Sequence, residues 1–209
     1  MKEKLILCVS VLSLFTASCK KDPLNNLTED ESRIYITNYD TSANFETYKT
    51  FSIADSVAVI SNNQLVAHER SSADAQFIAA FINALEGRGY TRVNRDQDPD
   101  LGLALSRVTN TTTSLVSYND YGGYYGGYWD PYYWDYPGYG YSFPTYYGVY
   151  ESSETAFMAD IFDLKNAEQN NQIRAVWSGM IRGSGIFNTT SIESQVAALF
   201  TQSPYLKAQ

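Results

Sequence analysis

The residues best suited to chemistry lie in one aromatic-rich stretch, 119–148, of a chain of 209 residues. Thirteen of the eighteen tyrosines fall within residues 118–150, among closely spaced glycines and prolines. Exposed aromatic rings can stack on sugars, and Tyr and Trp also hydrogen-bond at interfaces. The expected partner is a glycan or another protein, and the alternative is a disordered or self-packed low-complexity loop. The residues expected to make these contacts are Trp129, Tyr132, Tyr133 and Trp134.

The other reactive side chains favour a protein that is not an enzyme. His68 is the only histidine, and Cys8 and Cys19 are the only cysteines. Because both cysteines lie near the N-terminus, the rest of the chain offers no Cys–His pair and no multi-histidine metal site. Paired carboxylates can hydrolyse glycosides at the right separation, but acidic residues are also common in turns. We therefore expect no enzyme activity, no metal and no cofactor. The carboxylate pairs are Asp98/Asp100, Glu151/Glu154 and Asp160/Asp163.

The N-terminus is typical of an exported, lipid-anchored protein. Residues 2–4 are charged, and the apolar region of eleven residues that follows, 5–15, is too short to span a bilayer. Small residues then precede Cys19, which resembles a bacterial lipoprotein signal in which the cysteine is lipidated and becomes the new N-terminus. The alternative is an ordinary secreted protein in which Cys19 is incidental. We expect removal of residues 1–18, a membrane anchor at Cys19, and a flexible tether over 19–32.

The mature chain is expected to be acidic. Loss of the signal removes two lysines and one glutamate, so that the formal charge moves from −8 to −9. Such a charge argues against nucleic acid as a partner and against electrostatic attraction to anionic lipid. With 44% hydrophobic and 18% charged residues, residues 33–209 suit one globular domain that carries 119–148 as an insertion.

Two apolar runs near the C-terminal end, 155–164 and 173–182, predict a β-hairpin at the centre of a sheet. Both are rich in β-branched and aromatic residues, and the amide-rich connection 165–172 is typical of a hairpin loop. Strict alternation places Val176 on the face opposite Trp177. Because both faces are apolar, other elements must cover the sheet.

Two amphipathic helices are expected to supply that cover. Ser71 and Asp74 form the pattern of a capping box, and apolar residues recur at spacings of three and four through 71–88. Thr190 and Glu193 repeat the capping pattern before a second apolar stripe.

Shorter apolar runs predict further strands, whereas 54–70 is expected to be a loop with at most one short strand. The whole pattern predicts an α+β fold. It consists of an antiparallel or mixed sheet of about five to six strands, two helices packed on one face, and a long Tyr/Gly-rich loop. The additional strands are expected at 33–39, 48–53, 90–93 and 100–118.

Several segments follow one another in an order that resembles the DUF4136 family of bacterial envelope lipoproteins, of the kind found in the Bacteroidota. The resemblance covers residues 33–205 except the insertion, and the hairpin loop departs from the usual family turn. It implies an α+β domain in the cell envelope, as an outer-membrane lipoprotein that is either periplasmic or surface-exposed. The family is uncharacterised, so the resemblance implies no activity. The segments are Asp40 with 43–51, 85–90, 99–101, 160–164 with 176–179, and 196–200.

Asp55-Ser56-Val57 matches a short O-glycosylation pattern of the Bacteroidota, so Ser56 is an expected modification site. The function expected from the sequence is non-catalytic binding or structural support in the envelope. The alternative is a surface accessory lipoprotein that binds a glycan or peptidoglycan through the aromatic loop.

Overall fold

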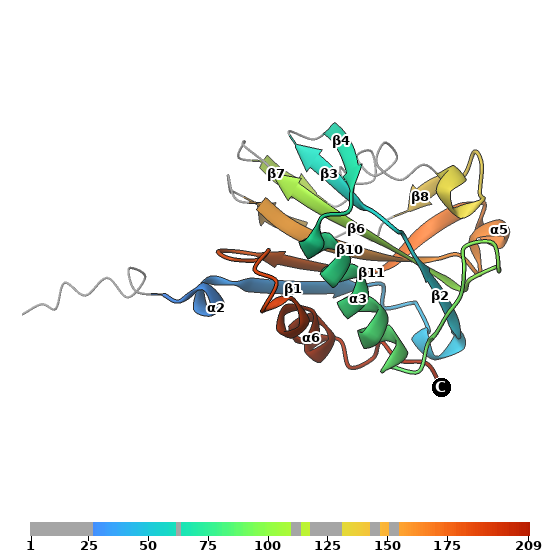
Figure 1. Ribbon diagram of the computed structural model, residues 1–209. Coiled ribbons are helices and arrows are strands. Elements are labelled where there is room, and N and C mark those ends of the chain that lie inside the picture. The colour runs from blue at the N-terminus through green and yellow to red at the C-terminus, as the bar shows by residue number, and fades with distance from the viewer. Residues whose placement is uncertain (1–26, 62–63, 110–113, 118–130, 143–146, 151–154) are drawn as a thin grey trace, which may run out of the picture.

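A computed structural model describes residues 27–61, 64–109, 114–117, 131–142, 147–150 and 155–209 (Figure 1). A mixed sheet forms the body of the protein, and helices pack on one of its faces. In chain order the elements are α2 (Glu29–Ser32), β1 (Ile34–Tyr39), η3 (Phe45–Thr47), β2 (Thr50–Ile53), β3 (Val57–Ser61), β4 (Gln64–Glu69), α3 (Ser72–Glu86), β5 (Thr91–Arg92), β6 (Leu101–Thr109), β7 (Ser114–Ser117), η4 (Pro131–Trp134), β8 (Gly140–Ser142), β9 (Tyr147–Tyr150), β10 (Thr155–Asp163), α5 (Ala167–Asn170), β11 (Gln172–Arg182) and α6 (Ile192–Gln202).

Nine of the described strands form one sheet, whose main path is β1-β11-β10-β6-β2-β5. β3 pairs with β6 beyond the end of β2, β4 pairs with β3, and β8 pairs with β11. β7 and β9 form a separate two-stranded sheet. The antiparallel pair β10–β11 confirms the predicted hairpin. The fold is α+β as expected, but it has more strands than predicted, and the short helices α2 and α5 accompany α3 and α6.

Three segments differ from the sequence-based expectation. Residues 54–70 contain the hairpin β3–β4 instead of a loop, and a register shift after Val59 interrupts the alternation that would have revealed it. The connection 165–172 contains α5, which ends at Asn171 in the left-handed conformation with φ 48°. The strand expected over 100–118 is two strands, β6 and β7, in different sheets.

A β-bulge changes the faces predicted for β11. The pairing of β10 with β11 runs to Ile161 opposite Trp177, and the next pair is Phe162 with Ala175. Val176 is therefore an extra residue, and it packs in the same core cluster as Trp177. Its predicted placement on the opposite face is wrong, because strict alternation fails where one strand gains a residue.

α3 and α6 cover the same face of the sheet, as predicted (Figure 1). Phe77 of α3 stacks on Phe157 of β10 with ring centroids 3.7 Å apart. The buried Trp177 donates from Nε1 to Ser203 Oγ at 2.9 Å, which satisfies its polar atom beneath α6. These contacts make the helical face a closed apolar core.

The two main helices begin differently. Asp74 donates its backbone N–H to Ser71 Oγ, and Ser71 N donates to Asp74 Oδ2 at 2.8 Å, so the predicted capping box forms. α6 begins after Ser191, whose side chain makes no capping hydrogen bond. The capping box predicted at Thr190 and Glu193 is wrong, because the preceding turn shifts the helix start by one residue.

The opposite face of the sheet is covered by the described part of the aromatic stretch, residues 131–142. Trp134 is 3% exposed and lies over Gly102 of β6, where a Cβ atom would come within 3.1 Å of two indole carbons. Tyr136 donates its hydroxyl to Leu164 O at 3.0 Å. Over these residues the aromatic stretch packs on the sheet, with Trp134 in the core and partly buried tyrosines around it, rather than protruding as a loop.

The last residues of the expected tether, 29–32, form α2, which Arg33 joins to the folded body. Arg33 is 7% exposed and donates from Nε to Ser184 O at 3.1 Å and from Nη2 to Gly185 O at 3.0 Å. It also pairs with Asp30 of α2. The folded body therefore includes α2, which lies within the expected tether 19–32, and residues 19–26 of that tether lie outside the described residues.

Gly102→Ala tests the packing of Trp134 on the sheet. The new methyl group would meet Trp134 and Leu164 at 3.0–3.1 Å, so the free energy of unfolding is expected to fall by about 1–3 kcal/mol. Chemical denaturation followed by tryptophan fluorescence measures the change. Gly140→Ala is the matched control, because a Cβ atom there meets nothing within 4 Å. Equal stability of the two variants would contradict the packing.

Candidate functional site

A polar groove lies where the aromatic stretch meets the ends of two parallel strands. β2 and β5 run parallel, with Phe51 opposite Arg92, so both end at the same edge of the sheet. The turn after β2 and the loop after β5 meet Tyr133 of η4 at this edge. The groove has a volume of about 410 Å³, and its lining includes Asp55, Arg92, Asn94, Arg95, Asp96 and Tyr133.

Tyr133 is held by contacts on several sides. Asp55 N donates to the phenol oxygen at 3.3 Å, and the guanidinium carbon of Arg95 lies 4.9 Å from the ring centroid. The ring of Trp134 meets it edge-on, with centroids 4.8 Å apart. Burial raises the pKa of the Tyr133 hydroxyl, so it stays a neutral phenol at physiological pH. The ring is thus a fixed wall of the groove.

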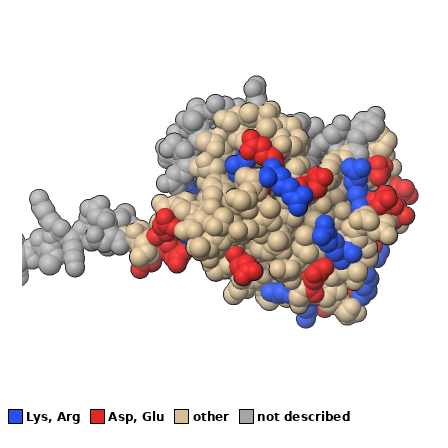
Figure 2. Space-filling view, viewed as in Figure 1, with Lys and Arg blue, Asp and Glu red and all other residues tan. Residues whose placement is uncertain are grey.

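A tight turn shapes the loop after β5. Gln97 N donates to Asn94 O at 3.1 Å, and Asn94 N donates to Gln97 Oε1 at 2.8 Å. Arg95 and Asp96 occupy the exposed centre of this turn. In Figure 2, basic and acidic side chains lie side by side over the end of the molecule that carries this loop. The groove therefore presents hydrogen-bond donors, acceptors and charges of both signs beside an aromatic ring.

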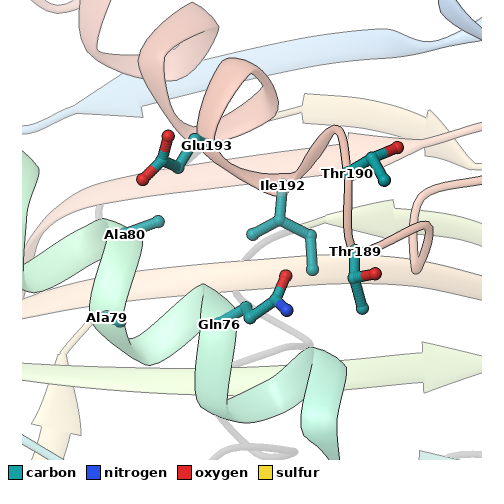
Figure 3. A pocket seen from close by; sticks show the side chains of 7 residues that line it. All are labelled: Gln76, Ala79, Ala80, Thr189, Thr190, Ile192 and Glu193. Atoms are coloured by element: carbon teal, nitrogen blue, oxygen red, sulfur yellow. The ribbon is translucent and has the colours of Figure 1, made fainter.

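A second hollow lies between α3 and α6 (Figure 3) and has a volume of about 260 Å³. It offers one carboxylate, one amide and two hydroxyl groups, but its lining includes neither an aromatic ring nor a basic group. It therefore gives a ligand fewer anchoring groups than the groove at Tyr133. Its lining residues are Gln76, Ala79, Ala80, Thr189, Thr190, Ile192 and Glu193.

The four aromatic residues predicted to contact a ligand do not share one environment in the structure. Tyr133 lines the groove. Trp134 is a core residue, so the prediction that it offers an exposed ring is wrong. Trp129 lies outside the described residues, as does the side chain of Tyr132. Cys19 also lies outside them, and its lipidation stays a prediction.

Ser56 lies next to the groove, in the turn between β2 and β3, and is half-buried. Its glycosylation stays a prediction.

Sequence analysis missed Arg92 and Arg95 as groove residues. The polar composition of 94–99 indicates a turn, but nothing in it reveals contact with Tyr133, which is distant in the chain.

Two of the carboxylates weighed for catalysis accept backbone N–H groups of the fold, and the one histidine lies away from the groove. His68 is exposed on β4. Asp100 accepts the backbone N–H of Lys49 at 2.6 Å, and Asp163 accepts that of Asn166 at 3.0 Å. The pair at 151 and 154 lies outside the described residues. In the part of the chain that the structure describes, no three His, Cys, Asp or Glu residues cluster in a way that could hold a metal ion.

Comparison with known proteins identifies the family. A family model described as "Domain of unknown function (DUF4136)" matches residues 36–205. A DUF4136 family protein (BT2437) from Bacteroides thetaiotaomicron VPI-5482, known from a crystal structure, is 29% identical. The match covers 85% of this chain and 99% of that one, with a TM-score of 0.67. No curated protein matches.

Two further solved structures are more distant. The PelC L103M dodecamer from Paraburkholderia phytofirmans is 14% identical, with 85% of this chain and 99% of that chain covered and a TM-score of 0.40. A PDZ domain protein from Parabacteroides distasonis ATCC 8503 is 13% identical, with 88% and 42% covered and a TM-score of 0.46. The family match and the first structure agree with the segments recognised in the sequence, and the chain belongs to the DUF4136 family.

Proposed function

We propose that this protein is a lipid-anchored protein of the cell envelope, held in the outer membrane, that acts by binding or structural support and not by catalysis. The charged start, the short apolar region and Cys19 support the anchor. The first described helix, α2, begins at Glu29, close in sequence to this cysteine. At about 3.6 Å per extended residue, the intervening chain keeps the domain within a few tens of ångströms of the membrane.

None of the described helices has the length and apolar character needed to cross a membrane.

The groove at Tyr133 supports a glycan as the bound molecule. Its volume of about 410 Å³ lies in the range of small-ligand sites, which combine apolar walls with a few polar groups. Tyr133 supplies an aromatic wall, while Asp55, Asn94 and Asp96 supply acceptors for hydroxyl groups. The one observation that carries this proposal is the placement of these polar side chains around a ring that is already fixed. A protein partner is the alternative, and the binding experiment below separates the two.

Cys19→Ala is expected to release the protein from membranes. The full chain, expressed with its own leader in a bacterium that makes lipoproteins, should partition into detergent and gain the mass of a lipid anchor. The variant should do neither, because a single thiol carries the acyl chains. Cys8→Ala is the matched control, since it removes the other cysteine. Membrane partition and mass that Cys19→Ala leaves unchanged would contradict the anchor.

Tyr133→Ala is expected to weaken glycan binding by at least about tenfold, because the ring forms a wall of the groove. Affinity electrophoresis against peptidoglycan fragments and a panel of polysaccharides, with the thermal midpoint of each variant, measures this. Tyr139→Ala is the matched control, because it truncates a half-buried tyrosine of the same stretch that does not line the groove. If both variants are retarded as strongly as the wild type, the groove is not the site. If no polymer retards the wild type, a protein partner is favoured.

A further inference from the structure

We infer that the groove at Tyr133 selects an acidic glycan, in which Arg95 and Arg92 bind a carboxylate carried by the sugar. The inference rests on the proposed binding role of this groove and adds the class of ligand. It starts from two arginines that pair with no carboxylate among the described residues, in a site that otherwise offers groups for hydroxyls.

These two arginines differ in their ion pairing from the arginines that hold the fold together. Arg33, Arg107 and Arg174 each pair with a carboxylate of their own chain. Arg92 and Arg95 form no ion pair with any described residue, although Asp55 and Asp96 line the same groove. Their guanidinium groups are therefore available to a ligand.

Arg95 is also oriented before any ligand arrives. Its guanidinium lies over the Tyr133 ring, at 4.9 Å from the centroid, and Asp55 N holds the phenol oxygen of that ring. A guanidinium that lies over an aromatic face can still donate from its N–H groups to a ligand. Because the Arg95 side chain has already lost part of its conformational entropy, ordering it around a bound carboxylate costs less free energy. A planar fork of donors matches a carboxylate through two parallel hydrogen bonds.

The remaining polar groups limit the kind of anion. Asp55, Asn94 and Asp96 accept hydrogen bonds, which suits a ligand rich in hydroxyl groups. The same two carboxylates, with a net charge of −8 on the chain, oppose a densely charged polyanion. The two arginines oppose a cationic ligand. A sugar that carries one carboxylate and several hydroxyls, as a uronic acid does, satisfies both sets of groups.

The test compares an acid with its uncharged ester. Binding of the full chain to oligogalacturonate and to its methyl ester is measured by calorimetry at about 0.15 M NaCl, where long-range attraction is screened. Alginate and hyaluronan oligosaccharides serve as further acidic probes, and dextran oligosaccharides serve as the neutral one. At least one acidic probe is expected to bind, and esterification of oligogalacturonate is expected to weaken any binding by about tenfold or more, since it removes charge-assisted hydrogen bonds.

Arg95→Gln should weaken binding of the acid by about tenfold, and Arg92→Gln by less, because no described aromatic ring lies under the Arg92 guanidinium to orient it. Both variants should bind dextran as the wild type does. Arg70→Gln is the matched control, because it removes an exposed arginine outside the groove and should leave affinity for the acid within about twofold.

Three results overturn the inference in distinguishable ways. If acid, ester and neutral sugar bind equally, and Tyr133→Ala alone abolishes binding, the glycan site stands and the selection for acids is wrong. If none of the acidic or neutral probes binds, both the acidic ligand and the glycan site are wrong. If Arg70→Gln weakens binding as much as Arg95→Gln, net charge and not the groove governs the interaction.

Discussion

The structure depends on one constraint: the central hairpin β10–β11 is apolar on both of its faces, and both must be covered. α3 and α6 cover one face, where Phe77 and Trp177 lie in the core. The other face has no long helix over it in the described structure, and residues 131–142 take that place. Burial of a large aromatic side chain contributes several kcal/mol, so Trp134 is a strong anchor for this stretch.

Because of this constraint, the first role of the aromatic stretch is structural. Dense Tyr, Trp and Gly in a long segment between strands favour a binding loop, and the folded part is first of all a cover for the sheet. Gly102 allows the close approach of Trp134, because any side chain at that position would occupy the space of the indole. The proposed binding groove lies at the margin of this cover, where Tyr133 meets the loop after β5. Fold and proposed site are therefore coupled, since the contacts that bury Trp134 also place Tyr133.

Much of the architecture could be predicted from sequence, because its signals are local. The three- and four-residue spacing of apolar side chains in α3, its capping box at Ser71, and the paired apolar runs of β10 and β11 all specify neighbours in the chain. Errors arise where a single residue changes the register. Val176 enters a bulge and changes face, and α6 starts beyond the capping pattern at Thr190.

The site was harder to predict than the fold, because it joins segments that are distant in the chain. Tyr133 was expected as a contact residue from its type and surroundings. Its partner Arg95 belongs to an ordinary polar turn, and Arg92 ends β5 just before that turn. Only the pairing of β5 with β2 brings both arginines to the groove. Trp134 and Tyr133 are adjacent and equally aromatic, yet one is core and the other lines the groove. Composition cannot separate them, because the difference depends on Gly102 and Leu164 across the sheet.

Hydrogen–deuterium exchange on the full chain tests the central claim most directly, namely that residues 131–142 are built into the sheet. The amide of Tyr136 donates to Pro131 O at 3.0 Å, and the strand β8 pairs with β11 from Gln172 to Arg174. Peptides from 131–142 should therefore exchange slowly, with protection close to that of the start of β11. Exchange of these peptides at the rate of an unfolded chain, while β10 and β11 stay protected, would contradict the account.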